Sequence, residues 1–257
     1  MNQSVGEQIF RPLAGDTFFF RCHRDVPCFT QCCARLRLIL TPYDILRMKN
    51  RLKIGSDEFL ERYTDTVMDN RSRFPRVRLK MRPDRKHTCP FVTQQGCSIY
   101  EDRPEACRLY PLGRATATVE GEKGARERFF MVAESHCHGF SEDRAWTLEE
   151  WMEHEGVNEF SALNHGWLGI ITSSRSLGPR EYEARKQQMF FMASYNLDRF
   201  RDFLFGSAFF DRFHVDPALR EALKKDDTAL MLFGFDWLRF SLFGEKTLEP
   251  RLKKEDK

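Results

Sequence analysis

All eight cysteines of this chain lie between Cys22 and Cys137, and any fold proposed for the chain has to account for that clustering. They fall into three groups, and no cysteine follows the last one. The groups are Cys22, Cys28, Cys32 and Cys33, then Cys89, Cys97 and Cys107, and finally Cys137. Thiolates are soft ligands for zinc, copper(I) and iron–sulfur clusters, so the clustering predicts one metal-bearing region built from all eight sulfurs.

Disulfide bonds and buried apolar cysteines are the two alternatives to metal binding. Disulfides form in oxidising compartments, and the residues from Met1 to Gln8 have neither the basic part nor the apolar part of a secretory signal. A chain of 257 residues can also form a hydrophobic core without cross-links. Isolated core cysteines would not gather in groups or stand side by side. We therefore expect a cytoplasmic protein whose cysteines bind metal.

The charge balance does not indicate a nucleic-acid or membrane partner. Lysine and arginine together number 41, aspartate and glutamate number 38, and the net charge of +3 is too close to neutral for either partner. The most apolar stretch, Ala229 to Phe243, is interrupted by Asp236 and Arg239 and is too short to span a bilayer. We expect no nucleic acid and no membrane span, and instead a protein partner.

The first half of the chain mixes predicted helices with short strands. Thr41 followed by Pro42 is typical of a helix start, and alternating apolar and basic residues are typical of a strand. The predicted elements are helices over 41–53 and 57–67, strands over 17–21 and 77–81, and a β-hairpin of 114–119 with 128–132. The hairpin has a glycine-rich turn over 121–124. Residues 1–16 are expected to be a loose arm.

Residues 141–257 are expected to be nearly all helical. Thr147 and Glu150 form a capping box, and apolar residues then recur at helical spacing. The predicted helices include 180–205 and 228–242, and the late phenylalanines are expected to form their core. The predicted fold class is mainly α with a small β-hairpin, with a cysteine-rich metal-binding half packed against a helical C-terminal half. The corresponding domains are 17–140 and 141–257.

The cysteine spacing narrows the choice of metal only in part. Cys28 and Cys32 are spaced as in zinc sites, whereas the other intervals fit neither ordinary zinc spacing nor the ferredoxin patterns. The side chains of the adjacent pair Cys32–Cys33 should diverge, by about 100° on a helix or to opposite faces of a strand. Each sulfur could then serve a different centre, or one could bridge two metals. Eight thiolates would suffice for two four-coordinate sites.

Arginines and histidines accompany the cysteines. Pro104 predicts a helix start that places Cys107 in the first turn, where the helix dipole stabilises a thiolate. Arg103 and Arg108 are candidate cofactor-binding residues, because they could offset the negative charge of a thiolate-bound cluster; alternatively, Arg103 forms a surface ion pair with an acidic neighbour. The histidines within two residues of a cysteine are candidate ligands or donors to sulfur: His23, His87, His136 and His138.

These motifs resemble those of a known family. Its opening of closely spaced cysteines is similar to the stretch from Cys22 to Cys33, although the intervals here are wider. Its second signature is similar to Cys89-Pro-Phe followed by Cys97-Ser-Ile-Tyr-Glu-Asp-Arg-Pro-x-x-Cys-Arg-x-Tyr-Pro, and its last cysteine to Cys137. The chain thus resembles the YkgJ-type cysteine-cluster family over about residues 18–140. The resemblance implies zinc or iron chelation, and flagellin lysine N-methylases share the same cysteine pattern.

Three functions agree with these features. The first, which we favour, is an iron–sulfur protein of the 4Fe–4S type with a redox or maturation role, because many thiols in irregular loops suit clusters better than one zinc ion. The second is a zinc-stabilised protein-binding module. The third is a protein-modifying enzyme similar to flagellin lysine N-methylase. The sequence contains no Gly-x-Gly-x-x-Gly loop and identifies no catalytic residue, so whether the protein is an enzyme stays open.

Overall fold

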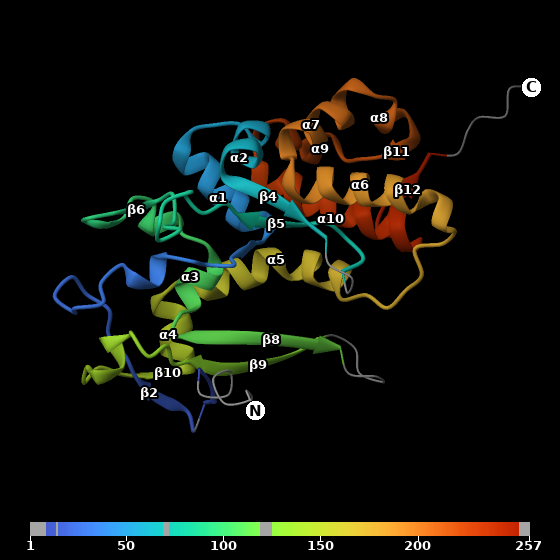
Figure 1. Ribbon diagram of the computed structural model, residues 1–257. Helices are drawn as coiled ribbons and strands as arrows, with labels where there is room; N and C mark the ends of the chain where they lie inside the picture. The colour runs from blue at the N-terminus through green and yellow to red at the C-terminus, as the bar shows by residue number, and fades with distance from the viewer. Residues whose placement is uncertain (1–8, 14, 69–71, 119–124, 252–257) are drawn as a thin grey trace, which may run out of the picture. The chain divides into compact units, whose positions relative to one another are not determined.

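The computed structural model describes residues 9–13, 15–68, 72–118 and 125–251 (Figure 1). About 49% of the described residues are helical and 17% are in strands, which form several small sheets. The fold is therefore mixed α/β, and the prediction of a mainly α protein with one hairpin is wrong in this respect. Many of the additional strands have only two to four residues, which is too short for an alternating pattern to be recognised in a sequence.

Two compact units make up the chain, and each combines two separate stretches. The cysteine unit consists of Met1–Ile39 and Leu79–Ala162, and the helical unit consists of Leu40–Arg78 and Leu163–Lys257. Every cysteine lies in the cysteine unit. The predicted domains, 17–140 and 141–257, divide the chain by cysteine content. That division stays a prediction, because compactness alone does not show which segment folds independently.

Short elements carry or flank the cysteines of the cysteine unit. Its strands are β1 (Phe10–Pro12), β2 (Thr17–Phe19), β6 (Val92–Thr93), β7 (Gly96–Cys97), β8 (Leu112–Thr118), β9 (Ala125–Val132) and β10 (Ala145–Thr147). Its helices are α3 (Glu105–Leu109), α4 (Leu148–His154) and the 3-10 helices η1 (Gln31–Cys33), η2 (Tyr100–Asp102) and η3 (His138–Ser141). The sheets have the strand orders β1-β9-β8, β10-β2 and β6-β7. The chain then continues into α5 (Val157–Ile171).

The predicted β-hairpin is confirmed as β8 and β9. These strands pair antiparallel, starting with Leu112 opposite Met131, and the predicted turn over 121–124 lies outside the described residues. β1 adds a third strand to this sheet, with Phe10 opposite Val132. The prediction of a loose N-terminal arm is therefore wrong for these three residues, which obtain backbone partners from β9.

Aromatic side chains form the core of the cysteine unit. Its buried members are Phe18, Phe20, Leu109, Leu112, Trp146, Trp151 and Val157. The indole N–H of Trp146 donates to the backbone carbonyl of Phe20 at 2.9 Å. Tyr110 and Cys137 pack against the same core. Because close-packed cores resist displacement, this one restricts the segments that carry the cysteines.

Longer helices dominate the helical unit. They are α1 (Pro42–Leu52), α2 (Ser56–Tyr63), α6 (Glu183–Tyr195), α7 (Leu197–Gly206), α8 (Phe209–Arg212), α9 (Pro217–Lys225), α10 (Asp227–Phe243) and the 3-10 helix η4 (Arg180–Tyr182). Strands β3 (Ile39–Leu40), β4 (Thr64–Val67) and β5 (Arg76–Leu79) form a sheet of order β3-β5-β4. β11 (Phe213–His214) pairs with β12 (Glu249–Pro250).

The capping signals in the sequence locate several helix starts. Thr41 and Asp44 exchange the two hydrogen bonds of a capping box at the start of α1. Thr147 and Glu150 do the same at the start of α4. α9 and α10 likewise begin after aspartates whose side chains accept backbone N–H bonds. Such caps act within a few residues, so the sequence alone suffices to predict them.

Two predicted helices end earlier than expected. α2 ends at Tyr63 rather than near residue 67, because the following residues are extended and form β4 beside β5. The single helix predicted over 180–205 is divided at Asn196, whose side chain accepts a hydrogen bond from the Arg199 N–H and caps α7. Asparagine favours such caps over helix interiors, because its amide competes for backbone hydrogen bonds.

The phenylalanine-rich core of the late helices is confirmed. Phe74 stacks on Phe190 with ring centroids 4.3 Å apart, and Phe200 stacks on Trp237 at 5.3 Å. β10, β11 and β12 show that residues 141–257 are less uniformly helical than predicted. No helix in the described part of the chain is long and apolar enough to cross a membrane.

A buried lysine joins three helices of the helical unit. Lys49 of α1 is 5% exposed, and its ammonium lies 2.7 Å from the Asp227 carboxylate of α10. Arg201 of α7 pairs with the same carboxylate, and Asp198 of α7 lies 3.9 Å from the ammonium. Burial alone would raise the pKa of Asp227, but the hydrogen bonds from Lys49 and Arg201 hold it below its ordinary value.

The substitution Asp227→Asn should destabilise the protein by about 3 kcal/mol at neutral pH, because it leaves the buried ammonium of Lys49 without its closest partner. The ionised carboxylate contributes stability above the ordinary aspartate pKa of 3.8, and this contribution is lost as the pH falls through the lower pKa of the folded state. The difference in unfolding free energy between wild type and variant should therefore shrink below about pH 4.

Chemical denaturation at neutral pH and near pH 3 measures this difference. Asp211→Asn, which changes an exposed carboxylate, is the matched control and should have little effect at either pH. If the unfolding free energies of wild type and Asp227→Asn differed by the same amount at both pH values, the ion pair would not be the cause of the destabilisation.

Candidate metal centre

Backbone hydrogen bonds bring the first cysteine group next to the last cysteine. β10 pairs with β2, the strand that precedes the first group. The Arg21 N–H donates to the Gly139 carbonyl at 3.0 Å. The His138 N–H donates to the Sγ of Cys28 at 3.1 Å. The segment around Cys137 is thus attached to the first group at two successive points.

Four thiols in this region are close enough to affect one another's ionisation. Partial burial, together with the thiols of Cys32, Cys137 and Cys28, raises the pKa of Cys22 to about 11. Burial raises the pKa of Cys137 as well, and Cys28 and Cys32 act in the same direction. Cys22 as a whole is exposed, so solvent screens part of its shift. The convergence of all eight sulfurs on one metal-bearing region stays a prediction.

The adjacent pair Cys32–Cys33 lies in the 3-10 helix η1. The neighbouring thiol of Cys33, together with burial, raises the pKa of Cys32. The divergence of the two side chains stays a prediction. Thr30, immediately before η1, adopts left-handed backbone with φ 68°, a local conformation that the sequence pattern did not indicate.

A small hairpin carries two cysteines of the second group. Cys89 precedes β6, and Cys97 ends β7 opposite Val92. Gly96 has φ +112°, a backbone conformation that favours glycine at this turn. Burial raises the pKa of both thiols, and Cys97 adds to the shift of Cys89. The Cys89 N–H donates to the Cys33 carbonyl at 2.8 Å, so the hairpin is attached to the first group.

Cys107 lies in the first turn of α3, as predicted. Its N–H donates to the Pro104 carbonyl at 2.9 Å. The helix begins one residue later than expected, at Glu105, because Pro104 has an extended ψ of 153° and acts as the N-cap. That the Cys107 sulfur joins the other seven in one metal-bearing region stays a prediction.

Arg108, the first of the two predicted cofactor-binding arginines, is 8% exposed and bonded to backbone. Its guanidinium donates to the carbonyls of Arg103 at 3.1 Å and Glu155 at 2.8 Å, and also to that of Glu101. It lies 4.5 Å above the ring of Phe160. These bonds hold the segment before α3 against the end of α4. A contact between Arg108 and a cofactor stays a prediction.

Arg103 is buried as well, and its charge acts on a cysteine. It pairs with the Glu155 carboxylate and lies over the Tyr100 ring, 3.7 Å from the centroid. Burial raises the pKa of Cys97, and the charge of Arg103 opposes that shift. The ion pair with Glu155 is buried, unlike the surface pair considered from the sequence. Glu155 lies 52 residues away along the chain, and no local pattern could have identified it.

The histidines near the cysteines have different surroundings. The ring of His23 lies 3.1 Å from the Glu142 carboxylate. The ring of His136 lies 3.8 Å from the Glu134 carboxylate, whereas His87 is exposed. His138 contacts sulfur through its backbone N–H rather than its ring. Ligation of a metal by any of these rings stays a prediction.

The thiols do not yet have the geometry of a metal site. Within residues 9–13, 15–68, 72–118 and 125–251, no three His, Cys, Asp or Glu side chains are grouped closely enough to hold a metal ion. The thiols with a raised pKa are Cys22, Cys32, Cys89, Cys97 and Cys137. A metal that bound these sulfurs would displace their protons. The donor type nevertheless fits zinc or an iron–sulfur cluster.

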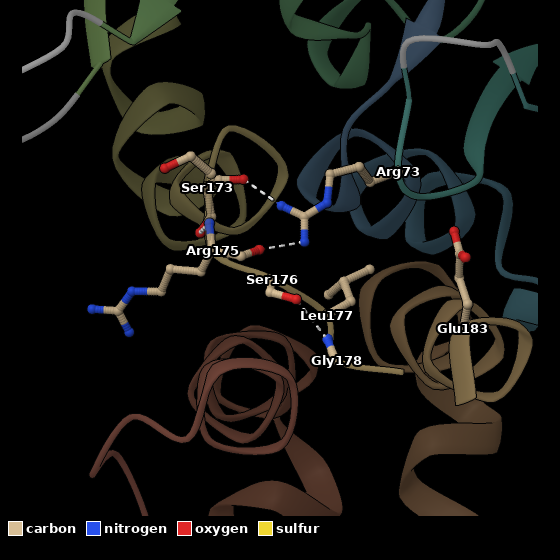
Figure 2. A pocket seen from close by; sticks show the side chains of 8 residues that line it. Arg73, Ser173, Arg175, Ser176, Leu177, Gly178 and Glu183 are labelled. Carbon is tan, nitrogen blue, oxygen red and sulfur yellow. Dashed lines mark hydrogen bonds between the residues drawn. The ribbon is translucent and has the colours of Figure 1, made fainter. Parts of the chain in front are cut away.

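A cavity in the helical unit contains no cysteine (Figure 2). It is open, has a volume of about 370 Å³, and is lined by Arg73, the loop 173–178 and Glu183. Arg73 donates to the carbonyls of Ser173 and Arg175, each at 2.5 Å. The Arg73 guanidinium thus anchors the loop 173–178 that lines the cavity.

Residues 21–138 match the family model CxxCxxCC, described as "Putative zinc- or iron-chelating domain". The matched range begins just before Cys22 and ends just after Cys137, so it includes all eight cysteines. No curated protein and no solved structure matches the chain. The match supports metal binding and does not distinguish zinc from iron.

The substitution Gly139→Ala should weaken the attachment between the first cysteine group and Cys137. An added Cβ would lie 2.6 Å from Cε2 of Phe20 and 3.0 Å from the Arg21 carbonyl oxygen. Because these contacts are too short, the chain must shift, at a cost of about 1–3 kcal/mol. We expect a lower melting temperature and a lower ratio of bound metal to protein.

Gly206→Ala is the matched control, since an added Cβ there meets nothing within 4 Å. Calorimetry gives the melting temperature, and elemental analysis gives the metal content, of the purified wild type and of each of the two variants. If Gly139→Ala kept the wild-type melting temperature and metal content, this backbone contact would not matter to the site.

Proposed function

Because residues 21–138 match the CxxCxxCC cysteine-cluster family model, we propose that the protein holds iron as one or two iron–sulfur clusters through its cysteine thiolates. The clusters serve electron transfer or a maturation step. Cysteine thiolates are the usual ligands of such clusters, four to each. When bound, a cluster supplies one-electron chemistry. The residues of this chain bind it, restrict solvent and place positive charge near the sulfurs.

The proposal rests above all on the position of Cys22. Its thiol is close to those of Cys32, Cys137 and Cys28, which come from separate stretches of the sequence. Cys33, the residue that follows Cys32, also acts on the Cys32 thiol and adds a fifth sulfur. One zinc ion takes four ligands, so five neighbouring thiols exceed what a single zinc site uses. This surplus favours a cluster, or more than one metal.

Arg103 acts on one of the thiols. Its guanidinium is buried and paired with the Glu155 carboxylate, and its charge opposes the effect of burial on the pKa of Cys97. A cluster with four thiolates carries net negative charge, and nearby hydrogen bonds and charges set its reduction potential. We expect the Arg103–Glu155 pair to influence that potential, while Arg108 braces the backbone around it.

A structural zinc site is the second candidate, and the β6–β7 hairpin favours it. Cys89 precedes this hairpin and Cys97 ends it, close enough for Cys97 to add to the raised pKa of Cys89, and zinc sites are commonly built from closely spaced cysteines. In this case the protein would be a zinc-stabilised module for a protein partner. The protein partner and the cytoplasmic location stay predictions under either proposal.

The double substitution Cys32→Ser and Cys33→Ser tests the ligand assignment. Serine oxygen does not replace thiolate for soft metals, so we expect loss of most bound metal and a lower melting temperature, because metal binding is coupled to folding. Gln31→Ser with Ala34→Ser, which changes the two flanking positions, is the matched control and should retain the metal. Anaerobic purification, elemental analysis and a visible spectrum provide the readout.

Iron with sulfide and a brown charge-transfer absorption in the wild type would support the cluster. Stoichiometric zinc and no colour would support the structural module instead. Full metal content and unchanged thermal stability in the double variant would contradict the assignment of Cys32 and Cys33 as ligands.

A further inference from the structure

Two stretches of the cysteine unit form a strongly basic surface that the proposed function does not use. They are residues 34–38 and 79–88, which we call the basic strip, and each directly adjoins a cysteine, Cys33 or Cys89. The strip contains six arginine and lysine side chains and one acidic side chain. Its net charge of +5 exceeds the +3 of the whole chain. Positive charge is thus concentrated at this place, although the chain as a whole is close to neutral.

Backbone hydrogen bonds hold the two stretches of the basic strip side by side. The Arg35 N–H donates to the His87 carbonyl at 2.9 Å, near one end of the shorter stretch. The Leu79 N–H donates to the Leu38 carbonyl at 2.9 Å, at its other end. The basic residues of both stretches therefore belong to one surface, although more than 40 residues separate the stretches in the sequence.

The only acidic side chain of the basic strip holds its loop closed. The Arg82 N–H donates to the Thr88 carbonyl at 2.8 Å. Between these two residues, the Asp84 carboxylate accepts hydrogen bonds from the N–H of Lys86 at 2.9 Å and from the N–H of Thr88 at 3.1 Å. It also accepts a bond from the Thr88 hydroxyl. Such bonds fix the backbone of the loop, so the basic side chains start from a defined position.

Four basic side chains of the strip are exposed and carry charge that nothing nearby neutralises. In the part of the chain that the structure describes, no ion pair is found for any of the four. They are Arg35, Arg37, Arg85 and Lys86. Arg82, by contrast, donates to the Pro90 carbonyl at 2.5 Å and supports the segment after Cys89. The four exposed side chains are therefore available to a partner.

The cysteine-bearing segments that adjoin the basic strip add no negative side chain. Residues 26–33 and 89–99 contain neither aspartate nor glutamate. The second of these segments includes the β6–β7 hairpin. A positive surface with uncharged neighbours attracts an acidic partner and raises its rate of association.

The composition of the basic strip favours an acidic protein over a nucleic acid. Neither stretch contains phenylalanine, tyrosine or tryptophan, whereas proteins that bind single strands combine basic side chains with aromatic rings on which bases stack. Arginine outnumbers lysine in the strip, and a planar guanidinium can bind both oxygens of a carboxylate.

We propose that the basic strip is a docking surface for an acidic protein, which binds through Arg35, Arg37, Arg85 and Lys86. The inference goes beyond the proposed function, because it depends on the charge and backbone of this surface and holds whether the cysteines bind iron or zinc. It gives the predicted protein partner a chemistry and a place, beside the segments that carry Cys33 and Cys89.

Fluorescence anisotropy with a labelled poly-L-glutamate peptide tests this inference on the full chain. The strip variant replaces all four side chains: Arg35→Gln, Arg37→Gln, Arg85→Gln and Lys86→Gln. We expect it to bind the peptide about 10-fold more weakly than the wild type, because four charge pairs are lost. Added salt should weaken binding by the wild type as well.

The matched control removes the same charge from exposed positions of the helical unit. It combines Arg180→Gln, Arg185→Gln, Arg212→Gln and Lys225→Gln, and it should bind the peptide nearly as well as the wild type. An equal loss in both variants would overturn the inference, because net charge alone would then explain binding. An unchanged affinity of the strip variant would overturn it too.

A single-stranded oligonucleotide with as many charges as the peptide tests the choice of partner. If the wild type bound the oligonucleotide more tightly than poly-L-glutamate, the assignment to an acidic protein would be wrong. Should the four changes lower the melting temperature, Arg85→Gln with Lys86→Gln at the loop repeats the test, and we expect about 3-fold weaker binding. Elemental analysis of the same samples keeps the two proposals apart: peptide binding by a protein without metal would contradict the proposed function alone.

Discussion

Backbone pairing between two distant stretches of chain forms the cysteine unit, and the arrangement of its thiols depends on that pairing. β2 pairs with β10, the Arg21 N–H reaches the Gly139 carbonyl, and the Cys89 N–H reaches the carbonyl of Cys33. Each bond joins a segment that carries or flanks one cysteine group to a segment next to another. The aromatic core around Phe20 then restricts these segments. Backbone pairing and the aromatic core thus hold the cysteine-bearing segments next to one another.

Gathering thiols in this way has an electrostatic consequence. Burial and the neighbouring sulfurs both disfavour the thiolate form, as the raised pKa of Cys22 illustrates. Metal binding reverses the preference, because the cation stabilises the thiolates and releases their protons. The charge of Arg103 near Cys97 and the His138 N–H on Cys28 then become favourable. The surroundings of the sulfurs therefore suit the metal-bound state better than the protonated one.

Local signals in the sequence were sufficient for part of this structure. The capping boxes at Thr41 and Thr147 act within four residues, and the β8–β9 hairpin follows from two adjacent alternating stretches. The eight cysteines indicated the metal chemistry that the family match supports. Contacts between residues that lie far apart in the sequence could not be predicted from such local signals. The partner of Arg103 and the pairing of β4 with β5 depend on tertiary structure, and the left-handed backbone of Thr30 before η1 has no signal in the sequence.

X-ray absorption at the metal edge of the anaerobically purified protein tests the central claim most directly. The account predicts a first shell of about four sulfur atoms for each metal, at a distance of about 2.3 Å. It predicts further that the shell is already complete in the protein as isolated, because the ligands come from one unit of the fold. A first shell of nitrogen and oxygen alone, at about 2.0–2.2 Å, would contradict it and would exclude the cysteines as the metal ligands.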